Sequence, residues 1–160
     1  MRFIYDLDHT VIDSSHRQLT LADGSLDLAH WIENNTRDRI MRDSLLPLAS
    51  HWREQRKRGA EIVVCTARVM GQDDLDFLYN HGLHFHALLS RELGDSTPDA
   101  ILKERLLREY AYNIGASWRR FCLFSTMLDD NQTVIDRLQS IGLTVYNAPM
   151  LNETLMEKIA

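Results

Sequence analysis

The sequence opens with a short apolar run that ends abruptly at two carboxylates. Phe3, Ile4 and Tyr5 are followed by Asp6 and, two positions further on, by Asp8. A short continuous apolar run is typical of a buried strand. Ligands of open α/β sheets bind at the carboxyl edge, where the strands end. The run therefore predicts a strand whose end carries a functional site.

Two further runs, at residues 61–66 and 121–128, stop at polar or charged side chains in the same way. These side chains are Thr66 and Arg68 after the first run and Asp129 and Asp130 after the second. In a parallel sheet the carboxyl ends of neighbouring strands meet at one edge. We therefore expect side chains that are far apart in the sequence to lie together there.

The predicted strands alternate with stretches of helical character. Amphipathic patterns and helix start signals predict helices at 44–58, 72–82, 98–112 and 132–141, with a short helix near the end of the chain. Further strands are expected at 85–89 and 143–146. This alternation predicts an α/β fold with a mainly parallel five-stranded sheet and right-handed crossovers.

The segment between the first strand and the helix at 44–58 is polar and rich in turn residues. Residues 11–25 are expected to form a loop or small hairpin over the site, and residues 26–43 two short helical pieces. The chain has 160 residues, the usual size of one domain. We therefore expect a single domain over 1–160 with a small insert at about 17–43.

The composition limits the binding partners and the cellular compartment expected for the protein. A net charge of -5 excludes the global basic field that drives nonspecific nucleic-acid binding. Cys65 and Cys122 lie in apolar runs, which favours buried free thiols in a reducing compartment. No stretch reaches the length of a membrane span and no signal peptide is visible, so the protein is expected in the cytoplasm, without a membrane partner.

The predicted sheet edge gathers four carboxylates, those of Asp6, Asp8, Asp129 and Asp130. At an effective dielectric of about 20, each close pair of like charges costs about 4 kcal/mol at about 4 Å. Such a cluster requires a cation or protons, and oxygen ligands beside a phosphate select Mg²⁺. Hydroxyl and ammonium groups such as those of Thr66 and Lys103 would then hold the phosphoryl oxygens.

Four short motifs, in order along the chain, resemble those of the haloacid dehalogenase (HAD) superfamily of phosphohydrolases. The segment 6–10 matches the DxDxT motif, and Thr66 stands at the second-motif position. Lys103 and the pair Asp129-Asp130 match the third and fourth motifs. The resemblance implies a Rossmann-like three-layer α/β/α fold. Because large caps close over small substrates in this superfamily, the small insert implies an open site that suits a nucleotide or a nucleic-acid 3' end.

A narrower resemblance is to the 3'-phosphatase domain of phage polynucleotide kinase/phosphatase. It rests on the segment 90–103, on Thr66-Ala67-Arg68, and on Arg17 beyond the first motif. The kinase half has no counterpart, because no GxxxxGK[ST] loop occurs in the chain. The resemblance implies a host-cell cytoplasmic location if the protein is phage-encoded.

The family resemblance implies a role for each motif residue. Asp6 would be the nucleophile that forms an aspartyl-phosphate, and Asp8 the general acid and base. Mg²⁺ would be held by Asp6, the main-chain carbonyl of Asp8, Asp129 and Asp130. The phosphate would be bound by Thr66 and Lys103. Substrate contact, or orientation of Lys103, would come from Arg17, Arg68 and Asp99.

Several interpretations stay open. His9 replaces the glycine commonly found in the first motif, and Asp99 and Lys103 are spaced for a surface ion pair on a helix. Arg17 could equally be an exposed loop arginine. Trp31 is assigned to the core or to a subunit contact, and a homodimer is not excluded.

The function expected first is removal of a 3'-phosphate from DNA or RNA ends or from nucleotides. The alternatives are a small-molecule or 5'-nucleotide phosphatase and a catalytically silent binding protein.

Overall fold

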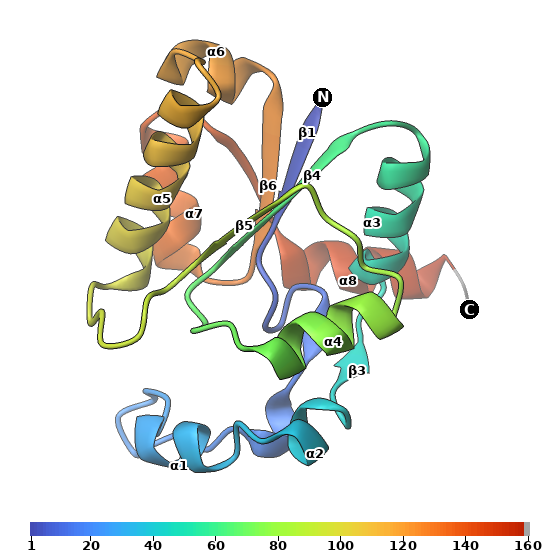
Figure 1. Ribbon diagram of the computed structural model, residues 1–160, viewed down its shortest axis with the longest axis vertical. Coiled ribbons are helices and arrows are strands. Elements are labelled where there is room, and N and C mark those ends of the chain that lie inside the picture. The colour runs from blue at the N-terminus through green and yellow to red at the C-terminus, as the bar shows by residue number, and fades with distance from the viewer. Residues whose placement is uncertain (159–160) are drawn as a thin grey trace.

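The computed structural model describes residues 1–158 and contains a five-stranded parallel sheet (Figure 1). Its strands are β1 (Arg2–Tyr5), β4 (Glu61–Thr66), β5 (Ala87–Ser90), β6 (Ser125–Asp129) and β7 (Thr144–Asn147). They lie in the order β5-β4-β1-β6-β7, and every pairing is parallel. The predicted α/β sheet is therefore confirmed, with β1 at its centre.

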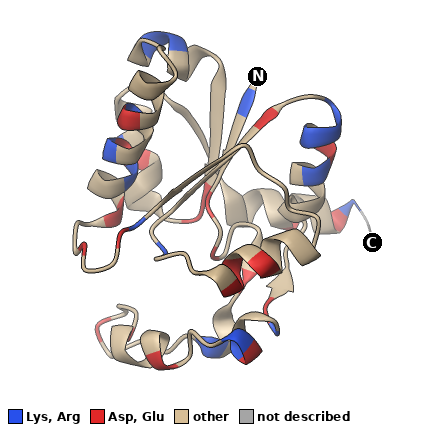
Figure 2. Cartoon of the chain, in the orientation of Figure 1, with Lys and Arg blue, Asp and Glu red and all other residues tan. Residues whose placement is uncertain are grey.

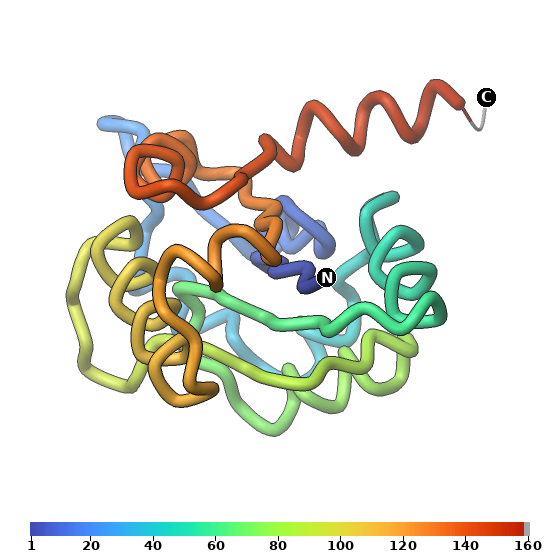
Figure 3. The backbone as a smooth tube through the Cα atoms, turned by 90° about the horizontal axis from the view of Figure 1, so that it is seen from above, coloured from blue at the N-terminus to red at the C-terminus, as the bar shows by residue number. Residues whose placement is uncertain are grey.

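Helices cover both faces of the sheet, which gives the expected three layers. One face carries α5 (Asp99–Asn113), α6 (Trp118–Leu123) and α7 (Gln132–Ser140). The other face carries α3 (Leu48–Lys57), α4 (Gln72–Asn80) and α8 (Ala148–Glu157). In Figure 3, α8 (red) and the green segment that contains α4 lie at the two ends of this second layer, with α3 (teal) between them.

The central strands β1, β4 and β6 contribute side chains to two separate cores because successive side chains point to opposite faces. Ile4 and Val63 belong to the core under α5, α6 and α7, whereas Tyr5 and Val64 belong to the core under α3, α4 and α8. The largest side chain buried in the second core is Trp52, whose ring stacks on Tyr5 at 4.9 Å. The sheet is thus buried on both faces, as a parallel sheet requires.

The insert crosses the carboxyl edge of the sheet (blue and light blue in Figure 1). Its elements are β2 (Ile12–Asp13), a 3-10 turn (Ser15–Arg17), α1 (Leu28–Glu33), α2 (Arg37–Ile40) and β3 (Ser44–Leu45). Strands β2 and β3 pair antiparallel and form its stem. Helix α2 packs near α4, where Arg37 bridges Asp73 and Asp76 at 2.7 Å each.

Two predicted boundaries are wrong. The run at 121–128 is not one strand: Ser117 caps α6, and β6 begins only at Ser125. Phe121 and Cys122 are apolar because they form the buried face of α6. The helix predicted at 44–58 begins at Leu48, because the residues before it pair with β2 or form its proline cap.

Cys65 and Cys122 are both free and buried, as expected. Within residues 1–158, no helix has the length and apolar character of a membrane span.

Candidate active site

Three carboxylates meet where the two central strands end. Asp6 follows β1, Asp129 is the last residue of β6, and Asp130 comes next. One ligand oxygen from each lies within 4.8 Å of the others. Figure 2 shows acidic residues in red at the carboxyl ends of the central strands. The sheet topology thus places Asp6 next to Asp129 and Asp130, which are distant from it in the sequence.

The register of the strands explains this closeness. Tyr5 pairs with Leu128, and the main-chain N–H of Asp6 donates to the Leu128 carbonyl at 3.0 Å. The side chains of Asp6 and Asp129 are therefore fixed by backbone pairing rather than by a flexible loop. Asn131 adds a further restraint, because its main-chain N–H donates to Asp129 Oδ1 at 3.0 Å while its side chain caps α7.

Lys103 reaches this cluster from α5. Its Nζ lies 3.0 Å from Asp6 Oδ1 and 2.7 Å from Asp129 Oδ2, and the side chain is buried. Burial disfavours the ammonium, but the two carboxylates outweigh that cost and raise the pKa of Lys103. The lysine is therefore charged and compensates one of the three carboxylates.

Within residues 1–158, Lys103 is the cation that forms ion pairs with Asp6 and Asp129, and Asp130 forms no ion pair, so the three carboxylates carry more negative charge than Lys103 offsets. Burial, opposed at Asp129 by Lys103, and the nearby charge of Asp6 raise the pKa of Asp129 and of Asp130 above the ordinary range. Three oxygen donors with excess negative charge fit a hard divalent cation such as Mg²⁺. The carboxylate of Asp8 is not part of this group, and metal binding through the main-chain carbonyl of Asp8 stays a prediction.

Thr66 stands at the end of β4 and is buried. Its Oγ1 accepts a hydrogen bond from the main-chain N–H of Arg68 at 3.2 Å. A hydroxyl that accepts can still donate its own hydrogen. Thr66 is thus oriented at the sheet edge as a donor suited to a phosphoryl oxygen.

The carboxylate of Asp8 is held by Arg68 and Ser14. Arg68 Nε lies 3.1 Å from Oδ2, while Arg68 Nη2 and Ser14 Oγ each lie 2.5 Å from Oδ1. Burial raises the pKa of Asp8, but the Arg68 guanidinium and these hydrogen bonds outweigh it and lower the pKa to about 2. Asp8 is therefore ionised in the free protein, with 23% of its side chain exposed to solvent.

Arg68 is itself fixed from several sides. Its Nη1 lies 2.5 Å from Asp74 Oδ1, its Nη2 lies 3.9 Å from Asp43 Oδ2, and the Trp31 ring lies 5.5 Å from its guanidinium. Only 2% of the Arg68 side chain is exposed. Arg68 therefore holds the Asp8 carboxylate, a role that the sequence did not predict, while substrate contact or orientation of Lys103 by Arg68 stays a prediction.

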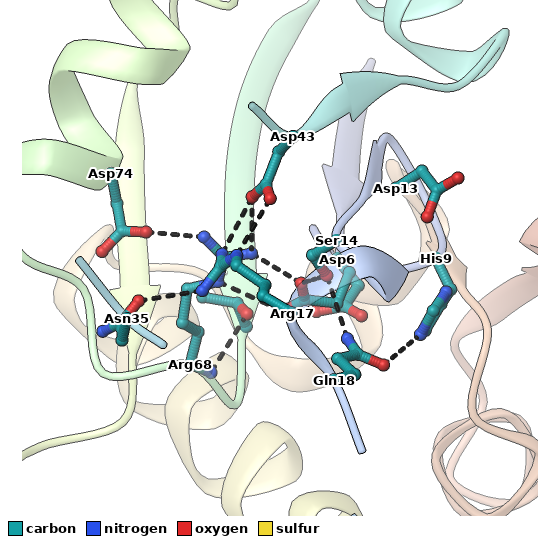
Figure 4. Close-up of polar contacts among 12 residues, drawn as sticks. Asp6, His9, Asp13, Ser14, Arg17, Gln18, Asn35, Asp43, Arg68 and Asp74 are labelled. Carbon is teal, nitrogen blue, oxygen red and sulfur yellow. Dashed lines mark hydrogen bonds and ion pairs between the residues drawn. The ribbon is translucent and has the colours of Figure 1, made fainter. Parts of the chain in front are cut away.

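Arg17 lies inside the insert (Figure 4). It forms a two-point ion pair with Asp43 at 2.9 Å for both bonds, donates to Asn35 Oδ1 at 3.0 Å, and stacks on Trp31 at 4.2 Å. Its side chain is fully buried, so the alternative of an exposed loop arginine is wrong. Trp31 does not belong to either core of the sheet. Its ring lies against the guanidinium groups of Arg17 and Arg68.

Asp99 begins α5 and pairs with Arg91 at 2.7 Å. Arg91 also donates to the Ala67 carbonyl at 2.8 Å, which ties the loop before α5 to the loop after β4. Lys103 points into the site instead, so the surface pair between Asp99 and Lys103 is not formed in the part of the chain that the structure describes.

Sequence reasoning missed three residues of this site, namely Ser14, Asp43 and Asp74. Asp74 carries a local signal, since it lies three residues after Gly71 at the start of α4 and accepts from the Gly71 N–H at 2.9 Å. The sequence gives no signal for the contact of Asp74 with Arg68, of Ser14 with Asp8 or of Asp43 with Arg17. The partners in these contacts come from separate segments of the chain.

Comparison with known proteins decides the family. A family model described as bacteriophage T5 5'-deoxynucleotidase matches residues 1–160. The chain belongs to this family. The 5'-deoxynucleotidase of Escherichia phage T5 is 30% identical over 174 residues, which cover 95% of the chain and 68% of that relative.

Solved structures agree at the level of the fold. A HAD-like hydrolase from Streptococcus pneumoniae covers 91% of the chain with a TM-score of 0.62 and 12% identity, over 83% of its own length. A chain of the Pnkp1/Rnl/Hen1 RNA repair complex covers 91% with a TM-score of 0.61 and 20% identity. The chain spans 41% of that longer protein. This member of the T5 5'-deoxynucleotidase family therefore has the fold of HAD-superfamily hydrolases, as its motifs predicted.

Proposed function

We propose that the protein is a Mg²⁺-dependent phosphomonoesterase that hydrolyses deoxynucleoside 5'-monophosphates through an aspartyl-phosphate on Asp6. The observation that carries the proposal is the position of Asp6. Its carboxylate lies 3.0 Å from the Lys103 ammonium and beside Asp129 and Asp130. An anionic nucleophile next to a fixed cation and a cation-binding cluster is what attack on a phosphate dianion requires.

The chain's own carboxylates suit the metal that this chemistry uses. Asp6, Asp129 and Asp130 would hold Mg²⁺ together with the main-chain carbonyl of Asp8. When bound, the ion offsets the negative charge of the cluster and of the incoming phosphate. Lys103 and Thr66 would hold the phosphoryl oxygens from the other strand ends.

Asp6 and Asp8 have different tasks in the proposed reaction. Asp6 attacks phosphorus, the bond from phosphorus to the ester oxygen breaks, and Asp8 gives its proton to that oxygen. Asp8 then takes a proton from water, which attacks the aspartyl-phosphate and releases inorganic phosphate and free Asp6.

In the free protein Asp8 is ionised, with a pKa of about 2, which is the form needed for the water step. The like charge of an approaching phosphate dianion favours its protonated form for the first step.

The choice of a 5'-monophosphate follows the family match and the activity printed for the T5 relative. Phosphate at the 3' end of a polynucleotide is the second candidate, because Arg17, Thr66 and Arg68 follow the pattern of phage 3'-phosphatases. In this structure both arginines are already held by carboxylates, which favours the first candidate. By analogy with the phage relative, we propose the host cytoplasm as its place of action.

A substrate panel tests the proposal. The protein is incubated with a deoxynucleoside 5'-monophosphate, the matching 3'-monophosphate, a 3'-phosphorylated oligonucleotide and p-nitrophenyl phosphate, each with Mg²⁺ or EDTA. We expect phosphate release to be fastest from the 5'-monophosphate, to require Mg²⁺, and to be abolished by Asp6→Asn in a folded protein. Faster release from either 3'-phosphate would favour the second candidate, and no release from any ester would leave the silent binding protein.

A further inference from the structure

A chain of side-chain hydrogen bonds leads from His9 through Gln18 and Ser14, which are labelled in Figure 4, to the carboxylate of Asp8. His9 Nε2 lies 2.9 Å from Gln18 Oε1, and Gln18 Nε2 lies 2.9 Å from Ser14 Oγ. Ser14 Oγ lies 2.5 Å from Asp8 Oδ1. Ser14 is fully buried, and Gln18 and His9 are partly buried, so the chain runs from the rim of the site to its interior.

The direction of every bond in this chain is determined by chemistry. An ionised carboxylate only accepts, so the Ser14 hydroxyl must donate to Asp8. The Ser14 oxygen then accepts from the Gln18 amide nitrogen, which turns the Gln18 carbonyl oxygen toward His9. That oxygen also only accepts, so His9 carries its hydrogen on Nε2. All donors in the chain therefore point toward Asp8.

The two oxygens of Asp8 are left in different states. Oδ1 takes two short bonds, from Arg68 Nη2 and from Ser14 Oγ, at 2.5 Å each. Oδ2 takes one longer bond, from Arg68 Nε at 3.1 Å. A carboxylate oxygen has about two lone-pair sites. Oδ1 is thus filled, and Oδ2 keeps a site for a proton.

The backbone at His9 points to the same conclusion. His9 has a φ of 54°, and among the described residues it is the one non-glycine with positive φ. Glycine adopts this region at little steric cost, whereas a side chain there is strained. Strained backbone persists where the surrounding structure requires it, often at functional sites. The Gln18 hydrogen bond gives the His9 side chain such a requirement.

We propose that His9, Gln18 and Ser14 are positioning residues that hold the Asp8 carboxyl in one orientation, so that Oδ2 exchanges the proton with the ester oxygen. This inference rests on the proposed function, because it assigns a task within the same reaction. His9 lies within the first motif, and Gln18 and Ser14 come from the loop beyond it.

The leaving group offers a direct test. A nucleoside alkoxide needs a proton to depart, whereas p-nitrophenolate departs readily without one. The ratio kcat/KM reports the reaction up to formation of the aspartyl-phosphate and is independent of the later water step. Loss of Asp8 orientation should therefore lower kcat/KM for the nucleotide much more than for p-nitrophenyl phosphate.

The informative variants are Gln18→Leu and Ser14→Ala, with His9→Gly to remove the outer donor at a position that suits glycine. Since a general acid contributes about 10²–10⁴-fold, we expect a loss on the order of tenfold with the nucleotide and less than about twofold with the aryl ester. His9→Gln retains a donor at similar reach and should restore most of the rate. Ser15→Ala is the matched control, because Ser15 makes a similar bond to Asp13 outside the chain.

Two outcomes overturn the proposal. Variants as active as the wild type on the nucleotide would show that the chain does not position Asp8. Equal losses on both esters in folded protein, checked by thermal melting, would show a general structural role. A wild type that hydrolyses neither ester would overturn the proposed function and the inference together, whereas an active wild type with either outcome above would overturn the inference alone.

Discussion

Raising the pH should destabilise the metal-free protein, and Mg²⁺ should reverse the effect. Burial, together with the charge of Asp6, raises the pKa of Asp129 to about 7 and that of Asp130 to about 6. Carboxyl groups in the unfolded chain titrate near pH 4. The folded state thus binds these protons more tightly, and the stability they contribute is fully present below about pH 4 and is lost as the pH rises to about 7.

The size of the effect follows from the same shift. The change at Asp129 from 3.8 to about 7 corresponds to about 4 kcal/mol at about 1.4 kcal/mol per pH unit. Asp8 has the opposite sign: its pKa is lowered to about 2, so its contribution is lost only below about pH 4, outside this window. Mg²⁺ at about 100 times its dissociation constant would return about 2.7 kcal/mol, or roughly 5–11 °C in Tm.

Thermal melting followed by circular dichroism is the assay, with EDTA or Mg²⁺ at about pH 5.5 and about pH 8 and constant ionic strength. We expect the rise in Tm caused by Mg²⁺ to be much larger at the higher pH, because protons compete for the same carboxylates. Asp130→Asn, which removes one acid from the cluster, should reduce the difference. A Mg²⁺ effect that is equal at both pH values, or larger at the lower one, would refute this account of the cluster.

Three further substitutions probe other parts of the structure. Arg17→Met removes the two-point ion pair of the buried Asp43 carboxylate, which keeps only contacts to His16 and, at 3.9 Å, to Arg68, and should cost about 3–5 kcal/mol in urea unfolding, most of which the double variant with Asp43→Leu should recover. Lys103→Met should abolish phosphate release in a folded protein, and retained turnover would show that the ammonium is dispensable. Trp52→Ala empties the core beside Tyr5 and should cost about 3–5 kcal/mol, measured in the same way, with activity unchanged below the unfolding transition.

The fold and the carboxylate cluster could be predicted from sequence because both depend on local patterns joined by one topological rule. Apolar runs identify strands, and parallel strands end at one edge, so Asp6 and Asp129 had to meet. The rule fails for the run at 121–128, where a helix with its apolar face toward the core has the same composition as a buried strand. Periodicity over so few residues does not separate the two.

The surroundings of Asp8 could not be predicted in the same way. Arg17 was recognised by its position after the first motif, but its partners Asp43 and Asn35 lie in the insert, where no periodic pattern fixes which side chains turn inward. In the sequence, Asp74 has the pattern of an ordinary helix cap, and its ion pair with Arg68 is evident only from the structure. Such pairings depend on how the insert folds over the sheet, which short-range signals do not specify.

The buried charged groups beside Asp8 contribute more to the orientation of its carboxylate than to the stability of the fold. A buried ion pair costs desolvation that its attraction often fails to offset. Here Arg68 has two carboxylate partners on opposite sides, Asp8 and Asp74, so it cannot turn toward one without losing the other. The indole of Trp31 and the nearby Arg17–Asp43 pair lie against the Arg68 guanidinium, of which only 2% is exposed. A small insert can therefore hold the Asp8 carboxylate, which we propose as the proton-transfer group, in one orientation beside the buried Asp6.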